Sequence, residues 1–314
     1  MTQSEGGALA GSASGVVAPR GERCVADRDE SDATPLEPLE SWFQASGLPE
    51  YPLPTLLSEL YGGPFGLATP LLYANFVESL DGVAALGPSS GSKLSGRSQA
   101  DRFVMGLLRA CADLILVGSG TLHGSPGHVW TAEHVFPPAA SAFADLRRRL
   151  GRAERPTLAV VTGSGEIDLG HAGLGRGGLL LTSDAGKRRL GSPRGFEVVP
   201  LGRGPELDPS RIVGALREAG NEALLTEGGP RLLAHLVRSG QLDQLFLTIS
   251  PLLAGRTTRQ RRPDLVDGAD LLGGVHSPWL SLLSAKRHRS HLFLRYGTEW
   301  AVGAPESATL AESG

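Results

Sequence analysis

Five polar side chains of this 314-residue chain could transfer protons or hold the polar groups of a ligand: Glu78, Ser79, Asp81, Asp101 and Glu227. A carboxylate in a cleft can anchor the N–H groups of a ligand or assist proton transfer. Two of the carboxylates also have a structural interpretation. Asp81 precedes a glycine, as turn aspartates do, and Asp101 stands where it could cap or charge the start of a helix. The residues alone leave both interpretations open.

Three short segments combine glycine with hydroxyl side chains directly after an apolar run. They read Gly118-Ser119-Gly120-Thr121, Thr162-Gly163-Ser164-Gly165 and Thr226-Glu227-Gly228-Gly229. Glycine lets backbone N–H groups approach a ligand closely, and a hydroxyl can bond a phosphate oxygen. If the apolar runs are strands of one parallel sheet, the three segments line one crevice. Such a crevice suits an extended ligand with several phosphates, such as a dinucleotide.

The third segment belongs to the clearest structural unit of the chain, residues 222–255. Residues 223–226 predict a short strand, and the turn after it needs backbone freedom that glycine supplies. Pro230 then stands at a first helical position, Gly240 stands where a helix ends, and a second strand follows. This order predicts a β-α-β unit whose helix N-terminus favours an anion. A tight turn without a ligand is the alternative.

The other elements follow from hydrophobic periodicity and turn residues. Strands are predicted at 71–77, 114–117, 157–162, 179–182, 196–199, 280–286 and 291–297. Helices are predicted near 54–61, at 101–112, 141–151 and 184–190, and between the N-cap Asp208 and Gly220. Residues 87–100 and 256–270 are expected to be loops, and 122–140 are expected to be irregular.

Strands that alternate with helices predict an α/β fold with a mainly parallel central sheet and helices on both faces. The late strand pair predicts an antiparallel addition to that sheet. The expected organisation is a disordered tail (1–35), an N-terminal arm (36–69), a main domain (70–300) and a C-terminal tail (301–314).

Composition excludes several classes of protein. The chain has 30 Lys+Arg, 33 Asp+Glu and a net charge of −3, so we expect no nucleic-acid partner and no membrane surface. No apolar run approaches a membrane span and no secretory core is present, so a cytoplasmic location is expected. Two cysteines exclude a disulfide framework and a multi-cysteine zinc site, and the histidine spacing predicts no metal. Walker A, Rossmann and G-x-S-x-G motifs are absent.

Five segments, taken in order, resemble a known family. They are Asn75-Phe76-Val77-Glu78-Ser79-Leu80-Asp81-Gly82, Leu94-Ser95-Gly96, Leu108-Arg109-Ala110-Cys111-Ala112-Asp113-Leu114-Ile115-Leu116-Val117-Gly118-Ser119-Gly120-Thr121, Leu225-Thr226-Glu227-Gly228-Gly229-Pro230 and Ile249-Ser250-Pro251-Leu252-Leu253-Ala254-Gly255. They resemble the reductase domain at the C-terminal end of the bacterial bifunctional riboflavin-biosynthesis deaminase–reductase. The resemblance covers about residues 70–297 and is greatest to stand-alone actinobacterial pyrimidine reductases.

The resemblance implies a dihydrofolate reductase-like fold and an NADPH-dependent homodimer that acts on a small molecule. Such a reductase converts the ribosyl group of 5-amino-6-(5-phosphoribosylamino)uracil to ribityl. The implied cofactor residues are Val117, Gly118, Ser119, Gly120, Thr121, Glu227, Gly228, Gly229 and Pro230, with Thr162, Gly163 and Ser164 at the adenosine ribose and its 2′-phosphate. The implied substrate residues are Asn75, Ser79, Asp81, Ser95 and Asp101. The catalytic candidates are Asp81, Asp101 and Glu227.

The chain departs from that family in two respects. It lacks the zinc motifs of the deaminase half, so only reduction is expected. The stretch from Leu122 to Trp130 also lacks the acidic residue and the arginine that riboflavin reductases carry near their substrate. Asp101 could instead hold a pterin, as a helix carboxylate does in dihydrofolate reductases. A pterin or dihydrofolate reductase and a non-catalytic nucleotide-binding module therefore stay as alternatives.

Overall fold

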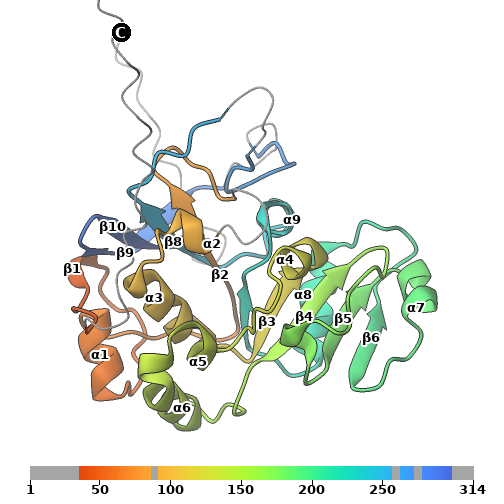
Figure 1. Ribbon diagram of the computed structural model, residues 1–314, viewed down its shortest axis with the longest axis horizontal. Helices are drawn as coiled ribbons and strands as arrows, with labels where there is room; N and C mark the ends of the chain where they lie inside the picture. The colour runs from red at the N-terminus through yellow and green to blue at the C-terminus, as the bar shows by residue number, and fades with distance from the viewer. Residues whose placement is uncertain (1–34, 86–90, 257–261, 272–277, 299–314) are drawn as a thin grey trace, which may run out of the picture.

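One large mixed sheet organises the chain (Figure 1). The computed structural model describes residues 35–85, 91–256, 262–271 and 278–298. The two predicted tails lie outside these residues, apart from Pro35. Within the described part, ten strands hydrogen-bond in the order β1-β9-β10-β8-β2-β7-β3-β4-β5-β6.

The strands have the following bounds: β1 Glu40–Gln44, β2 Leu71–Ser79, β3 Leu114–Gly118, β4 Thr157–Thr162, β5 Gly178–Thr182, β6 Phe196–Pro200, β7 Ala223–Thr226, β8 Gln244–Ser250, β9 Leu280–His288 and β10 His291–Thr298. The strands from β8 through β2 to β6 pair in parallel. The pairs β8–β10, β10–β9 and β9–β1 are antiparallel. The fold class predicted from the sequence is therefore confirmed.

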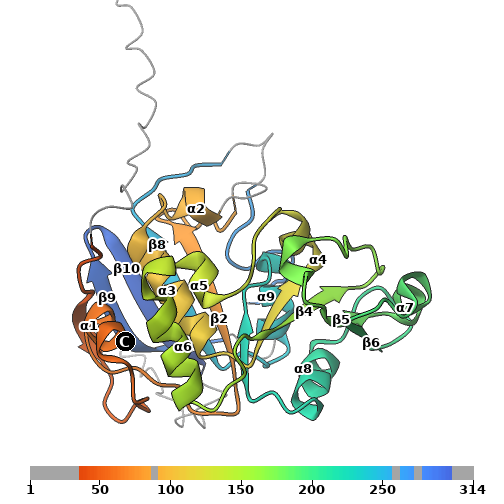
Figure 2. The ribbon, with the colours of Figure 1, turned by 60° about the horizontal axis from the view of Figure 1, so that its bottom comes forward.

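The helices have the following bounds: α1 Thr55–Tyr61, α2 Gly91–Leu94, α3 Gln99–Ala110, α4 Ser119–His123, α5 Ala132–Val135, α6 Ala140–Arg149, α7 Asp184–Leu190, α8 Pro209–Glu218 and α9 Pro230–Arg238, with short 3₁₀ turns at Pro137–Ala139 and Ala172–Leu174. Helices α1, α3, α5 and α6 contribute to a core on one face of the sheet, and α8 and α9 contribute to a core on the other (Figure 2). Strands β3 and β7 are buried on both sides, which explains why their sequences are continuously apolar.

Helix α3 is fixed at both ends. At its N-terminus, the Ser98 hydroxyl accepts a hydrogen bond from the Asp101 amide at 3.3 Å. At its C-terminus, the buried Arg147 of α6 donates to the carbonyl oxygens of Arg109, Ala110 and Ala112 at 2.8–3.2 Å. These contacts satisfy backbone groups that a helix end leaves without partners. They hold α3 at a defined height along the sheet, so the positions of Asp101 and Arg109 are set.

The N-terminal arm joins the same body. Its helix α1 was expected, but its strand β1 was not, and β1 forms an edge of the sheet beside β9. The buried Lys286 of β9 ties the arm down, because its ammonium donates to Ser41 Oγ and to the Gly62 carbonyl, both at 3.2 Å. The same ammonium lies 4.5 Å from the centre of the Tyr61 ring. Burial lowers the pKa of Lys286 to about 8.

Several predicted boundaries are corrected. Helix α3 begins at Gln99, two residues earlier than predicted, because Ser98 is its N-cap. Part of the predicted 87–100 loop is helical (α2), and the region 122–140 contains α5 and the end of α4. Other parts of the two predicted loops, residues 87–90 and 257–261, lie outside the described residues. Strands β4 and β7 have the predicted bounds.

Candidate active site

The three glycine segments follow neighbouring strands of the sheet. Strand β3 lies between β7 and β4, and all three run parallel. The Glu227 amide donates to the Leu116 carbonyl at 3.1 Å, which ties the end of β7 to β3. An ideal Cβ built on Gly229 would lie only 3.3 Å from Thr121 Oγ1, so the segments after β3 and β7 are in contact. Helices α4 and α9 accordingly lie side by side in both views (Figures 1 and 2).

Two glycines of the first segment border open space. A Cβ added to Gly118 or Gly120 would meet no heavy atom within 4 Å. Gly118 has φ −82° and ψ 154°, a conformation open to any residue, and Gly120 is not in the left-handed region. Neither packing nor backbone conformation therefore requires glycine at these positions. Room for a ligand that approaches the backbone closely is the remaining physical reason.

The segment after β7 uses glycine differently from our expectation. Neither Gly228 nor Gly229 has a positive φ, so the turn does not need the left-handed region. The requirement at Gly228 is steric, because an added Cβ would lie 2.5 Å from Leu232 Cδ2. Gly229 is the N-cap of the nine-residue helix α9 and, being glycine, contributes no side-chain cap of its own. Its first-turn N–H groups and its dipole suit an anion.

The glycines after β4 have a packing explanation. An added Cβ on Gly163 would clash with the Pro205 carbonyl, and one on Gly165, whose φ is +71°, would lie 2.6 Å from the Gly186 carbonyl. Thr162 is buried and its carbonyl accepts from the Thr182 hydroxyl at 2.6 Å. Ser164 is exposed. In this segment the glycines allow close packing of loops, and Ser164 is the side chain left facing solvent.

Asp101 is the predicted carboxylate whose surroundings best suit chemistry. It is buried near the start of α3, and its carboxylate is hydrogen-bonded by Thr248 of β8 and by Ser95. Burial raises the pKa of Asp101, while the two hydroxyls and the nearby His291 act in the opposite direction. The charge of Glu227 also raises this pKa, which places Asp101 near the segment after β7. A carboxyl group with a raised pKa can hold or deliver a proton.

The remaining predicted substrate residues lie on β2 and in the loop after it. Asn75 and Ser79 are buried in β2, and Val77 between them pairs with Thr248 of β8. Alternate residues of a strand share a face, so Asn75 and Ser79 are on the Val77 side of β2. Thr248 of β8 therefore lies beside the face of β2 that carries Asn75 and Ser79, and it also bonds to Asp101 at the start of α3.

Asp81 is occupied by internal hydrogen bonds. Its carboxylate accepts from the Ser79 hydroxyl at 2.6 Å and from the amides of Ala254 and Gly255 at 2.9 and 2.8 Å. The Ser79 hydroxyl oxygen in turn accepts from the Val83 amide at 2.9 Å. The Ser79 hydroxyl and these two amides lower the pKa of Asp81 to about 2. Through these hydrogen bonds, Asp81 joins the loop after β2 to the loop after β8.

The carboxylate of Glu227 is hydrogen-bonded within the protein by Arg109, a residue for which the sequence predicted no role in the site. Arg109 Nε and Nη2 donate to the two carboxylate oxygens of Glu227 at 2.9 and 2.7 Å. Both side chains are buried, with exposed fractions of 1% and 9%. Arg109 stands on the apolar helix α3, and a charged residue there is a signal for a buried ion pair. Thr248 was missed because a threonine in a strand is ordinary.

Three of the described histidines, His128, His134 and His171, lie against one another or against Trp130. The His128 ring lies 4.9 Å from the Trp130 ring and 5.1 Å from the His134 ring, centre to centre. His171 Nε2 donates to the Ser125 carbonyl at 2.9 Å. Among the described residues, no cluster of His, Cys, Asp or Glu has the arrangement of a metal site. Cys111 is buried, as its position in the apolar stripe of α3 predicts.

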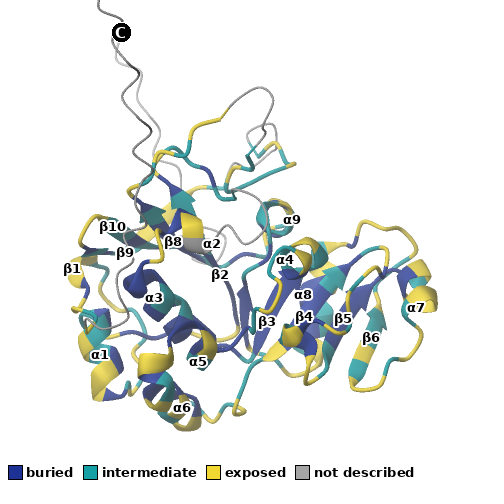
Figure 3. Cartoon of the chain, in the orientation of Figure 1, coloured by how far each residue is buried: buried dark blue, intermediate teal, exposed yellow. Residues whose placement is uncertain are grey.

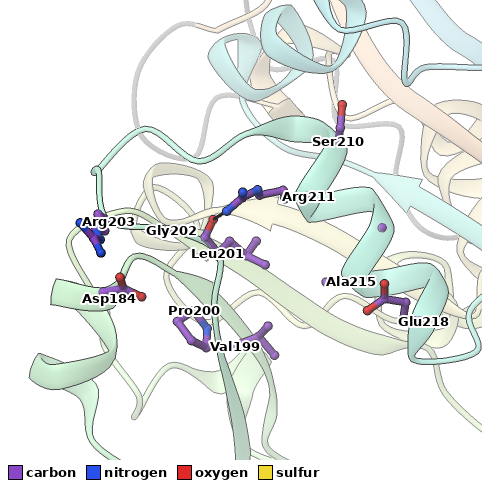
Figure 4. A pocket seen from close by; sticks show the side chains of 11 residues that line it. Asp184, Val199, Pro200, Leu201, Gly202, Arg203, Ser210, Arg211, Ala215 and Glu218 are labelled. Carbon is purple, nitrogen blue, oxygen red and sulfur yellow. Dashed lines mark hydrogen bonds between the residues drawn. The ribbon is translucent and has the colours of Figure 1, made fainter.

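A separate pocket lies at the far end of the sheet. It has a volume of about 810 Å³ and lies between β6, the edge strand, and α8 (Figure 4). Arg203, Arg211, Asp184 and Glu218 line it, and Arg211 Nη1 donates to the Leu201 carbonyl at 3.2 Å. Strands β3, β4 and β5 separate β6 from the strands around Asp101. No residue predicted from the sequence lines this pocket.

Comparison with known proteins places the chain in a family. The profile of the RibD C-terminal domain family matches residues 70–277. A pyrimidine reductase-like protein from Corynebacterium diphtheriae superposes with a TM-score of 0.54 at 22% identity, covering 73% of this chain and 92% of that chain. RibD from Acinetobacter baumannii gives a TM-score of 0.54 at 16% identity, covering 77% of this chain and 60% of that chain. The riboflavin biosynthesis reductase Rib7 from Saccharomyces cerevisiae gives 0.50 at 14% identity, covering 76% and 93%. A search of curated proteins found no match.

The fold is an α/β fold built on a single mixed sheet. The chain belongs to the RibD C-terminal domain family, and this membership implies an oxidoreductase. The match to solved structures supports the same fold, and the chain spans 60% of the length of RibD. Among the described helices, none has the length and apolar character needed to cross a membrane.

The carboxylate of Asp81 predicts a dependence of stability on acid. Its folded pKa is about 2, below the ordinary value of 3.8, so the ionised group stabilises the fold above about pH 4. This stabilisation is lost as the pH falls towards 2. We expect the difference in unfolding free energy between wild type and Asp81→Asn to shrink over that range, measured by urea denaturation. A difference that stays constant from neutral pH to pH 2 would contradict the assignment.

Proposed function

We propose that the protein is an NADPH-dependent reductase of the riboflavin-biosynthesis type. Its substrate would be 5-amino-6-(5-phosphoribosylamino)uracil, whose ribosyl group it would reduce to ribityl. The observation that carries the proposal is the contact between the segments after β3 and β7, where Gly118 and Gly120 border open space beside the start of α9. Membership of the RibD C-terminal domain family supports the same assignment.

The chain's own residues suit the parts of such a cofactor. The N–H groups at the start of α9 would hold the pyrophosphate, and Gly118 to Thr121 would lie along the nicotinamide half. Ser164, exposed after β4, would lie at the adenosine ribose and its 2′-phosphate. When bound, the reduced nicotinamide supplies a hydride to C1 of the ribosyl group. A proton must be added in the same reduction, and Asp101 is the buried carboxyl placed to hold it.

Other roles follow for the remaining catalytic candidates. The carboxylate of Asp81 accepts hydrogen bonds from three donors within the protein. The carboxylate of Glu227 accepts two, both from Arg109. We call the space bordered by Gly118, Gly120 and the start of α9 the slot. We propose that Asp81 and Glu227 hold the loops around the slot in place. We propose that Asp101, Asn75 and Ser95 are nearest to the substrate.

A pterin or dihydrofolate reductase is the second candidate. The observation that favours it is Asp101, a buried helix carboxylate hydrogen-bonded to Thr248, with no acid or arginine in the stretch 122–130 that would match a sugar phosphate. Incubation with NADPH and either the ribosylaminopyrimidine phosphate or dihydrofolate separates the two. Loss of the nicotinamide absorbance with the pyrimidine alone is expected, and loss with dihydrofolate alone would favour the alternative. Tight NADPH binding without oxidation by either compound would indicate a non-catalytic nucleotide-binding module.

A substitution at Gly118, which borders open space, tests cofactor binding directly. The Cβ of Gly118→Val would meet no heavy atom within 4 Å, and valine suits the extended backbone, so we expect the variant to fold. It should weaken NADPH binding at least about tenfold by filling the slot. Isothermal titration calorimetry measures the affinity, and Gly214→Ala in α8, another glycine with open space, is the control. Equal NADPH affinity in Gly118→Val and wild type would refute the cofactor assignment.

The role of Asp101 predicts a pH effect on catalysis. Because burial raises its pKa, Asp101 stays protonated to a higher pH than an exposed carboxyl, and activity that uses its proton falls as the pH rises through this pKa. Asp101→Asn should lower kcat/KM by about 10² or more and remove that limb of the pH profile. Asp243→Asn is the control, since Asp243 is another carboxyl whose pKa burial raises but serves the Leu72 amide. An unchanged profile in Asp101→Asn would exclude it as the proton source.

We also propose that the protein is a cytoplasmic homodimer. Large apolar side chains are exposed on β1 and β9, with exposed fractions of 58% for Trp42, 46% for Phe43 and 38% for Leu282. Strand β1 is largely in the colour of exposed residues in Figure 3. Neither of the two hydrophobic cores contains Trp42, Phe43 or Leu282. A second copy would bury such a patch and would cover the outer edge of β1, which pairs only with β9 within the part of the chain that the structure describes. Leu282→Glu should convert a dimer to a monomer in sedimentation velocity, and a wild-type protein that is monomeric at every concentration would contradict the proposal.

A further inference from the structure

The guanidinium group of Arg109 uses all of its hydrogen-bonding capacity. A guanidinium carries five N–H donors and no acceptor. In addition to the two bonds to Glu227, Nη2 contacts His128 Nε2 at 2.9 Å. Nη1 donates to the carbonyl oxygens of Thr131 and Val129 at 3.2 and 3.4 Å. Five donors therefore meet five acceptors in a buried position.

The partners of Arg109 belong to two separate segments. Glu227 begins the turn that leads through Gly228 and Gly229 into α9, and His128 to Thr131 form the end of the loop that follows α4. Helix α4 borders the first of these segments, because an ideal Cβ on Gly229 would lie 3.3 Å from Thr121 Oγ1. One buried side chain on α3 thus bonds to the cofactor side of the slot and to the stretch 122–131.

The contact with His128 defines the state of that imidazole. Because a guanidinium can only donate, Nε2 of His128 must accept, so the neutral ring carries its proton on Nδ1. Burial, followed by the charge of Arg109 and of the neighbouring histidines, lowers the pKa of His128 to about 3. His128 is therefore an uncharged acceptor throughout the physiological range, and it adds no charge repulsion to the network.

We propose that Arg109 is a positioning residue of the reductase site, which holds the 227–229 turn and the 125–131 loop in one fixed arrangement. This inference rests on the proposed function, since it assigns the turn to the cofactor. With only 1% of its side chain exposed, Arg109 would act through Glu227 and His128 and not through a ligand. A lysine cannot replace it, because an ammonium has three donors at one point instead of a planar fork.

The test compares Arg109→Lys with Arg295→Lys. Arg295 is a second buried arginine, but it lies on β10 and donates to Gln244 Oε1 and to the Gly66 carbonyl, not to α3, the turn or the loop. Amide hydrogen exchange of the cofactor-free proteins is measured in peptides that cover 125–131 and 227–230. We expect at least about tenfold faster exchange in both segments in Arg109→Lys, and wild-type exchange in both segments in Arg295→Lys. Faster exchange in neither segment, in only one, or equally in both variants would overturn the proposal.

A second variant keeps the test decisive if Arg109→Lys does not fold. His128→Phe retains the ring against Trp130 and His134 but removes the nitrogen acceptor. We expect faster exchange in 125–131 alone, with NADPH affinity within about twofold of wild type and a raised KM for the pyrimidine. Wild-type exchange in 125–131 would overturn the role of this contact.

Titration of the same variants with NADPH separates this inference from the proposed function. If wild type binds NADPH and Arg109→Lys, alone among the variants, binds it at least about tenfold more weakly, both the proposed function and the positioning role are supported. Wild-type protein that does not bind NADPH refutes the proposed function, while the exchange result still decides whether Arg109 joins the two segments. Binding by wild type and equal binding by Arg109→Lys refutes the positioning role and leaves the proposed function standing.

Discussion

The parallel pairing of β7, β3 and β4 is the constraint on which the site depends. Parallel strands end at the same edge of a sheet, so three segments separated by 40 residues (122–161) and 60 residues (166–225) of chain lie at that edge. The crossover helices then lie on the two faces, with α3 on one side and α9 on the other. The slot lies where β7, β3 and β4 end side by side, and Gly118 and Gly120 leave open space next to the end of β3.

Polar groups within the body keep that edge in place. Ser98 and Arg147 fix the ends of α3, and Arg109 and Asp101 are therefore held at set positions along the helix. Asp81 joins the loop after β2 to the loop after β8, and Arg109 joins α3 to the turn after β7. A buried charge is expensive unless it is paired and hydrogen-bonded, and the buried carboxylate of Glu227 satisfies that condition through Arg109. The residue left with a raised pKa and hydroxyl partners, Asp101, is then the one best able to exchange a proton.

The sequence predicted most of the fold because local signals and tertiary structure agree in the parallel part. The strands β4 and β7 are apolar runs with clear glycine ends, and their bounds were predicted correctly. Strand β1 was missed because Glu40–Gln44 is an edge strand whose residues are mostly exposed, so no alternation marks it. The sequence predicts a late start for α3, because Ser98, its N-cap, follows a stretch rich in Gly and Ser that is typical of a loop.

The site was less predictable, because a residue type does not reveal its partner. Asp81 and Glu227 have the composition of catalytic groups, but their partners are 173 and 118 residues away in the chain. Arg109 was read only as part of a motif, although it is the main link between two walls of the slot. The glycines after β4 and those after β3 look alike in sequence, and only the space around an added Cβ distinguishes packing from an open position.

A crystal structure of the protein with NADPH tests the central claim most directly. The account predicts the cofactor in one slot, with its pyrophosphate at the start of α9 and its nicotinamide half against Gly118 and Gly120. A cofactor bound instead in the pocket between β6 and α8, or one that contacts only one of the three glycine segments, would contradict the account.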